Sequence, residues 1–131
     1  MKAAARIRQE EKGQTATELA LVLPVFCLLL FGIIQFGIVF NNYVTVTDAV
    51  RAGARKAAVS RLESSPCGVA QAAVRKSAGG LDQSKLTTSC SSTWQPGADV
   101  TVEASYPYEI NLLGFVAAKG RLTSKTTERV E

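Results

Sequence analysis

The feature that most constrains this chain is an apolar run from Leu19 to Phe40 that contains no charged residue. A helix needs about 20 apolar residues to cross the hydrocarbon core of a bilayer, and this run is long enough. Gln35 is its one strongly polar side chain. The run therefore predicts a single membrane-spanning helix at about residues 19–40, with the lipid bilayer as a partner.

A cleaved secretory signal peptide is the main alternative for this region, because the segment before the run is basic. A signal peptide has a shorter apolar core, which is followed by a cleavage site with small residues. Here the run is followed by Asn41, Asn42 and Tyr43, which provide no such site. We therefore expect the helix to stay in the product. The positive-inside rule places residues 1–13 in the cytoplasm and the chain from Asn41 onward outside.

Three motifs around the run resemble those of a known family. Basic residues precede Gly13, and Glu18 follows five residues later at the entry to the apolar helix, which is the layout of a type IV prepilin leader. The motifs are Gly13–Pro24 (GQTATELALVLP), Gly32–Gly37 (GIIQFG) and Ala49–Arg55 (AVRAGAR). In this order they resemble the TadE-like family, the minor pseudopilins of the tight-adherence (Flp) type IV pilus assembly system.

The resemblance implies a processing site between Gly13 and Gln14. A membrane-embedded prepilin peptidase is expected to cut this bond and to remove the cytoplasmic leader, residues 1–13. The new ammonium group of Gln14 then pairs with Glu18 of the same or an adjacent subunit and sets the register of packed helices. The alternative is that Glu18 is an acidic residue near a helix N-terminus, stabilised by the helix dipole without a partner.

The function implied by the resemblance is that of a minor pseudopilin that helps pilus assembly or surface adhesion. Its expected partners are prepilin peptidase, other pilus subunits and the tight-adherence assembly proteins in the cytoplasmic membrane. The alternative is an uncleaved single-pass protein whose outer domain is a binding or scaffold module. We expect no enzyme, cofactor or metal, because the chain has no histidine and no glycine-rich phosphate loop. The net charge of +4 lies partly in the leader and gives no reason to expect nucleic acid.

The helical pattern continues beyond the expected span. From Asn42 to about Leu62 the chain has no proline and a single glycine, and apolar or small residues recur at helical spacing. We therefore expect one helix over residues 14–62, loosened at Pro24, whose second half presents a narrow packing stripe. The stripe consists of Val39, Tyr43, Val46, Val50, Gly53 and Ala57.

Residues 63–131 predict a small extracytoplasmic head. Pro66 is expected to end the long helix, and residues 69–77 to form a short second helix. Residues 82–96 are rich in Ser and Thr and are expected to form a loop, with a short strand at 86–89 as an alternative.

The end of the chain predicts a small antiparallel sheet. Apolar and polar residues alternate over 100–105 and again over 121–130, so these segments are expected to pair, with Pro107 interrupting the first. The apolar stretch Leu112–Val116 is expected to fold back into the core; the alternative is an exposed patch for a partner. The fold class is therefore α+β and pilin-like: a long N-terminal helix with a head that contains a short helix and a small antiparallel sheet.

Two of the three cysteines bracket the short helix and the loop. Outside the cytoplasm such cysteines commonly pair, so Cys67 and Cys90 are predicted to form a disulfide. A zinc site is the competing interpretation, but two cysteines in a chain without histidine do not complete an ordinary zinc shell. Cys27 lies inside the apolar run and is expected to act as a small hydrophobic residue.

Overall fold

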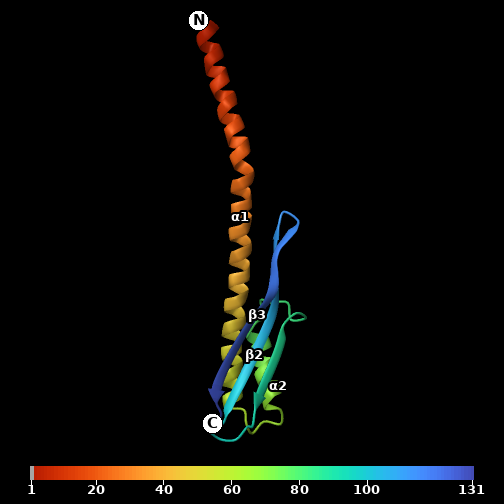
Figure 1. Ribbon diagram of the computed structural model, residues 1–131. Helices are drawn as coiled ribbons and strands as arrows, with labels where there is room; N and C mark the ends of the chain where they lie inside the picture. The colour runs from red at the N-terminus through yellow and green to blue at the C-terminus, as the bar shows by residue number, and fades with distance from the viewer. Residues whose placement is uncertain (1) are drawn as a thin grey trace.

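The computed structural model describes residues 2–131, with side chains described from Gly13 onward. The chain forms a long helix followed by a short helix and a sheet, so the predicted α+β class is confirmed. Figure 1 shows the long helix extending far beyond a head built from the other elements. The elements are α1 (Lys2–Ala58), α2 (Pro66–Ser77), β1 (Thr87–Ser92), β2 (Asp99–Leu112) and β3 (Phe115–Arg129).

Helix α1 is longer at its amino end than predicted and shorter at its carboxyl end. It begins at Lys2, continues through Pro24 and ends at Ala58 rather than at Leu62. Ser60 accounts for the early end, since its N–H donates to the Ala57 carbonyl (3.0 Å) and its hydroxyl donates to the Lys56 carbonyl (2.5 Å). Such local serine hydrogen bonds compete with continuation of a helix.

Helix α2 packs directly on α1 through a glycine. A Cβ atom at Gly53 would collide with the side chain of Val74 and lie 3.1 Å from the carbonyl oxygen of Ala70. Only glycine therefore permits this close approach. The predicted short helix begins earlier than residue 69, because Pro66 occupies its first turn, where a missing N–H costs no hydrogen bond.

The three strands form an antiparallel sheet in the order β1-β2-β3. The predicted pairing of 100–105 with the last strand is confirmed, with Val102 opposite Thr126. The expected interruption at Pro107 is wrong, since β2 continues to Leu112. β1 pairs with β2 only as far as Ser105, so one edge of β2 is open at Pro107, and an open edge tolerates proline. β1 itself occupies part of the expected loop.

The core lies between the sheet, α2 and the second half of α1. From the predicted stripe, Val46, Val50, Gly53 and Ala57 are buried, whereas Tyr43 is 44% exposed. The disulfide joins Cys67 at the start of α2 to Cys90 in β1, with the two Cα atoms 5.6 Å apart. The buried apolar residues are Val46, Ala49, Val50, Ala54, Ala57, Ala58, Ala70, Val74, Ala78, Leu81, Leu86, Val100, Val102, Ala104 and Val130.

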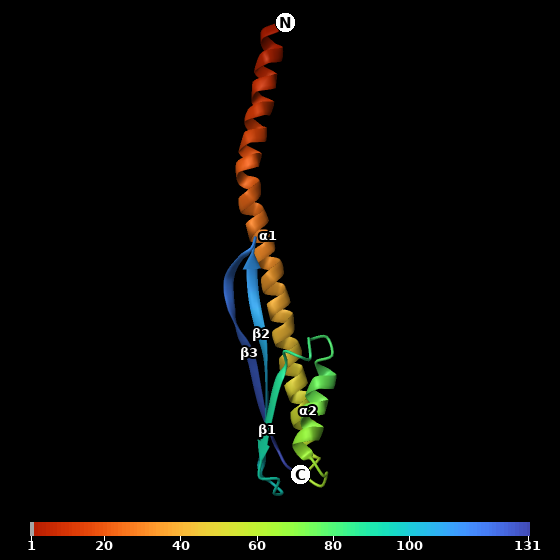
Figure 2. The ribbon, with the colours of Figure 1, turned by 90° about the vertical axis from the view of Figure 1, so that its right-hand side faces the viewer.

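The turn between β2 and β3 corrects another prediction. Leu113 and Gly114 both have positive φ (49° and 92°), as in the two-residue turns that match the twist of a hairpin. The hairpin therefore continues straight, and Leu113, Phe115 and Val116 are exposed instead of folding back into the core. Figure 2 shows this ribbon running beside α1, past the end of β1.

Candidate processing and assembly site

Helix α1 brings the predicted processing and assembly residues onto neighbouring turns. The side-chain amide of Gln14 donates a hydrogen bond to the Glu18 carboxylate, with Nε2 and Oε1 3.2 Å apart. The hydroxyl of Thr17 donates to the carbonyl oxygen of Gly13 at 2.9 Å. Both hydrogen bonds join residues four positions apart, which lie on the same face of a helix. Gly13, Gln14 and Glu18 therefore form one local group at the entry to the apolar run.

Gly13 has no packing role among the residues whose side chains the structure describes. A Cβ atom added there would meet nothing within 4 Å. Glycine inside a helix is less favourable than alanine by about 0.8–1.0 kcal/mol. Contacts within the described part of the chain therefore give no reason for glycine at this position.

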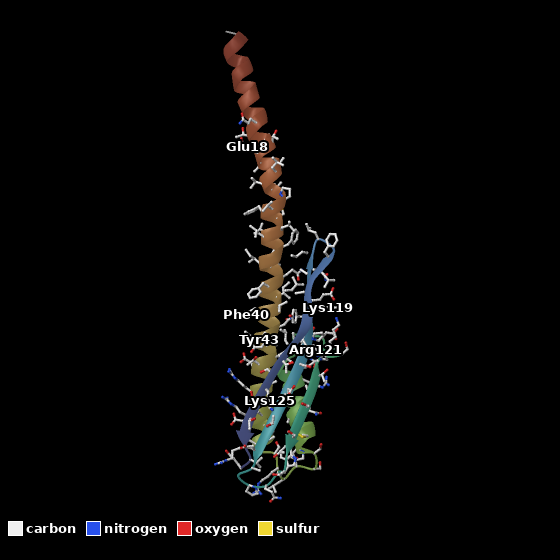
Figure 3. All side chains as sticks on the ribbon, viewed as in Figure 1. Glu18, Phe40, Tyr43, Lys119, Arg121 and Lys125 are labelled. Carbon is white, nitrogen blue, oxygen red and sulfur yellow. A yellow bond between two sulfur atoms is a disulfide. The ribbon has the colours of Figure 1, made fainter. Side chains whose placement is uncertain are left out.

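The position of Glu18 along α1 bears on the helix-dipole interpretation. The helix begins at Lys2, and no acidic residue lies in its first turn. The favourable interaction with the dipole is confined to the first turn, which Glu18 does not reach. Figure 3 shows Glu18 on the part of α1 that lies far from the head. Stabilisation by the dipole therefore does not explain this carboxylate while residues 2–13 precede it in the helix.

The helix that follows Glu18 is apolar and uncovered. Large side chains such as Leu21 (73% exposed), Phe31 and Phe36 project from α1 and are exposed. Among the described residues, one helix is long and apolar enough to cross a membrane, and the most apolar part of it is not buried. These features fit a single-pass membrane protein with a small α+β head.

The head contains no candidate metal centre among the side chains described from Gly13 onward. No group of three or more His, Cys, Asp or Glu residues lies close enough together to hold an ion. Cys67 and Cys90 are bonded to each other.

The chain resembles one protein family over its amino-terminal part. Residues 13–55 match the family model described as TadE-like protein. The match begins at Gly13 and includes all three sequence motifs, so the predicted TadE-like resemblance is confirmed. It associates the chain with pilus assembly, and the family is not known for enzymatic activity. Neither the comparison with curated proteins nor the comparison with solved structures gave a match.

One feature of the span was not predicted from the sequence. The end of β2 reaches the apolar part of α1, where a groove forms between Leu112 and the helix. The sequence signal for this feature was a pair of strand-like segments, one on either side of Leu113-Gly114. This signal was overlooked because the first strand was assumed to be interrupted at Pro107. The residues of α1 that line the groove are Val25, Leu28, Leu29, Gly32 and Ile33.

Proposed function

We propose that this chain is a minor pseudopilin of a tight-adherence pilus, processed by a prepilin peptidase between Gly13 and Gln14. The observation that carries the proposal is the group Gly13, Gln14 and Glu18, placed at the entry to an apolar helix that the head leaves uncovered. The family match supports it, since the matched segment begins at residue 13.

Glycine at position 13 suits the peptidase rather than the fold. Without a side chain, Gly13 lets a catalytic group approach the backbone on either side of the bond. The bond lies within α1, and the Gly13 carbonyl accepts a hydrogen bond from Thr17, so the helix must open locally before cleavage. Glycine makes this opening easier because it stabilises a helix less than other residues do. Hydrolysis leaves a carboxylate on Gly13 and an amine on Gln14.

The amine of processed Gln14 is the proposed partner of Glu18. Side chains on a helix point toward its N-terminus, so the Glu18 carboxylate lies over the turn that contains Gln14, as their 3.2 Å hydrogen bond illustrates. Cleavage adds an ammonium group to this turn, and charge-assisted hydrogen bonds are stronger than neutral ones. Pairing with the amine of its own or an adjacent subunit removes an isolated charge from the edge of the hydrocarbon and sets the axial register.

The uncovered part of α1 is the proposed assembly surface. Gly32 and Gly37 have no neighbours within 4 Å of a Cβ position, so they leave room for a second helix backbone. In this proposal residues 1–13 are the cytoplasmic leader, residues 14–58 the assembly helix and residues 63–131 the extracytoplasmic head. The partners are other pilus subunits and the assembly proteins of the membrane.

An uncleaved single-pass protein with an outer binding module is the second candidate. The observation that favours it is the continuity of α1 through residue 13, which shows no break at the proposed cleavage site. This candidate predicts that residues 1–13 remain attached.

The decisive experiment is the mass and N-terminal sequence of the mature protein in cells with and without prepilin peptidase. The proposal predicts a product that begins at Gln14 only when the peptidase is present. Gly13→Val should abolish processing, whereas Gly37→Val, a matched glycine without neighbours, should be processed normally. A leader retained in both strains would refute the proposal.

The role of Glu18 needs a separate assay, since processing and assembly are different steps. Glu18→Gln keeps the shape of the side chain and removes its charge. We expect normal processing but loss of copurification with other pilus subunits. Glu63→Gln, which removes an exposed charge outside the apolar run, is the control and should copurify normally.

A further inference from the structure

The β2–β3 hairpin extends well beyond the folded core. β1 pairs with β2 only between Val100 and Ser105, whereas β2 and β3 remain paired as far as Leu112 and Phe115. The last part of the hairpin is therefore a two-stranded ribbon. It runs beside α1 toward the amino end of that helix (Figures 1 and 2).

The end of this ribbon, the apolar tip (Leu112–Val116), is exposed on its outer side. Leu113 is 63% exposed and Phe115 is 78% exposed. On its inner side, Leu112 lines a groove against the middle of the apolar run, together with residues such as Leu29 and Ile33. The apolar tip and the apolar run therefore form one continuous apolar surface.

The ribbon becomes charged a short distance behind the tip. Glu109 lies opposite Lys119 in the strand register. Figure 3 places Lys119 close to the level of Phe40, where the apolar run of α1 ends. Both elements therefore change from apolar to polar at about the same level, which is the pattern expected at a membrane surface.

From this arrangement we infer that the apolar tip inserts into the outer leaflet of the bilayer that α1 crosses. The partner that covers the tip is lipid. Acyl chains surround Leu113, Phe115 and Val116, and the ammonium group of Lys119 lies among the headgroups. The continuity of the tip with the apolar run favours lipid, because the medium that covers the helix at this level also covers the tip. The inference rests on membrane insertion of α1 and does not depend on cleavage at Gly13.

The geometry limits how deeply the tip enters. Lys119 and Phe115 are four positions apart in β3, a separation of about 13 Å at about 3.3 Å per residue. This is less than half of a hydrocarbon core of about 30 Å. The outer edges of a two-stranded ribbon also carry unpaired backbone groups, which are costly in hydrocarbon. The tip therefore stays within the outer leaflet, with Leu112 at the level of the middle of the apolar run, and holds the head against the membrane beside α1.

Tryptophan quenching in nanodiscs that hold one full-length chain each tests the inference. Phe115→Trp places a reporter at the exposed tip, Phe31→Trp reports from the apolar run, and Leu62→Trp, at a side chain 88% exposed beyond the end of α1, is the control. Fluorescence of each variant is compared with that of the parent, whose single tryptophan is Trp94. The discs contain lipids brominated either near the headgroup or near the chain end.

We expect the added tryptophan at position 115 to be quenched severalfold more than that at position 62, and more by lipids brominated near the chain end than by lipids brominated near the headgroup. Quenching at position 31 but not at 115 would overturn the inference while leaving membrane insertion of α1 intact. Absence of quenching at positions 31 and 115 would overturn both the inference and the membrane insertion of α1. If the tryptophan at 115 is shielded only in discs that hold several chains, a second copy covers the tip and the inference is wrong.

Discussion

The two halves of α1 are equally helical but have opposite surroundings. Before about residue 45, large apolar side chains such as Leu21 and Phe36 project in all directions and are exposed. After that point the apolar residues form one stripe, and Val46, Val50 and Ala54 are completely buried against the head. One continuous helix therefore lies in two environments, and the two halves differ in the size of their apolar side chains.

Residue size explains why the head covers only the second half. The buried stripe is rich in alanine and contains Gly53, so α2 and the sheet approach the helix closely. A helix that is apolar on all sides needs an apolar medium or other helices around it. The first half therefore depends on partners outside the chain, whereas the second half is stabilised within it.

An aspartate introduced into each half of α1 should give the largest difference between the two halves, because one change affects head stability and the other affects membrane insertion. Val50→Asp buries an unpaired carboxylate and should destabilise the head by about 3–5 kcal/mol. Leu30→Asp should leave the head folded and disfavour membrane insertion by about 2.5–3.5 kcal/mol. Urea unfolding in detergent, followed by the fluorescence of Trp94, measures the first effect, and protease protection of membrane-inserted protein measures the second. If Leu30→Asp also unfolded the head, the two halves would not be independent.

The cysteines provide a second contrast. Cys67 and Cys90 are 23 positions apart, and closing a loop of this size contributes about 3 kcal/mol in the chain-entropy model. Replacing both by serine should lower the free energy of unfolding of the head by about that amount. Cys27→Ser, in the apolar run, should leave the unfolding midpoint unchanged. Equal effects of the two changes would show that the span contributes to the stability of the head.

The glycines of α1 give a third contrast. Gly53→Ala introduces a methyl group against Val74 and should cost about 1–3 kcal/mol of head stability through overpacking. Gly37→Ala, in the exposed half, meets no neighbour and should not reduce the stability of the head. The same urea titration compares the two variants. A neutral Gly53→Ala would mean that α2 can shift away from α1 without loss.

The sequence predicted those features that depend on local pattern. The uncharged run up to Phe40 predicted the long exposed helix, alternation predicted the pairing of Val102 with the last strand, and the spacing of Gly13 and Glu18 suggested the processing group. The structure places Gly13, Gln14 and Glu18 together, and the family match begins at the same glycine. Whether the Gly13–Gln14 bond is cut remains a prediction.

Features that depend on neighbouring strands were predicted less well. Pro107 favours the end of a strand when considered alone, but the open edge of β2 beyond Ser105 accommodates it. That one assumption shortened β2 and hid the groove between Leu112 and α1. The end of α1 was missed for a similar reason, since the hydrogen bonds of Ser60 are not visible in hydrophobic periodicity.

The smallest expected effect concerns the charges beside the buried stripe. Arg51 and Asp48 form an ion pair of 3.7 Å whose side chains are 62% and 66% exposed. Pairs this exposed contribute about 0.2–0.5 kcal/mol on a helix, because water screens them. A double-mutant cycle of Asp48→Asn and Arg51→Gln should therefore give a coupling energy of that size, decreasing with added salt. A coupling above about 1 kcal/mol would mean that water screens this pair within α1 less than the exposure of its side chains indicates.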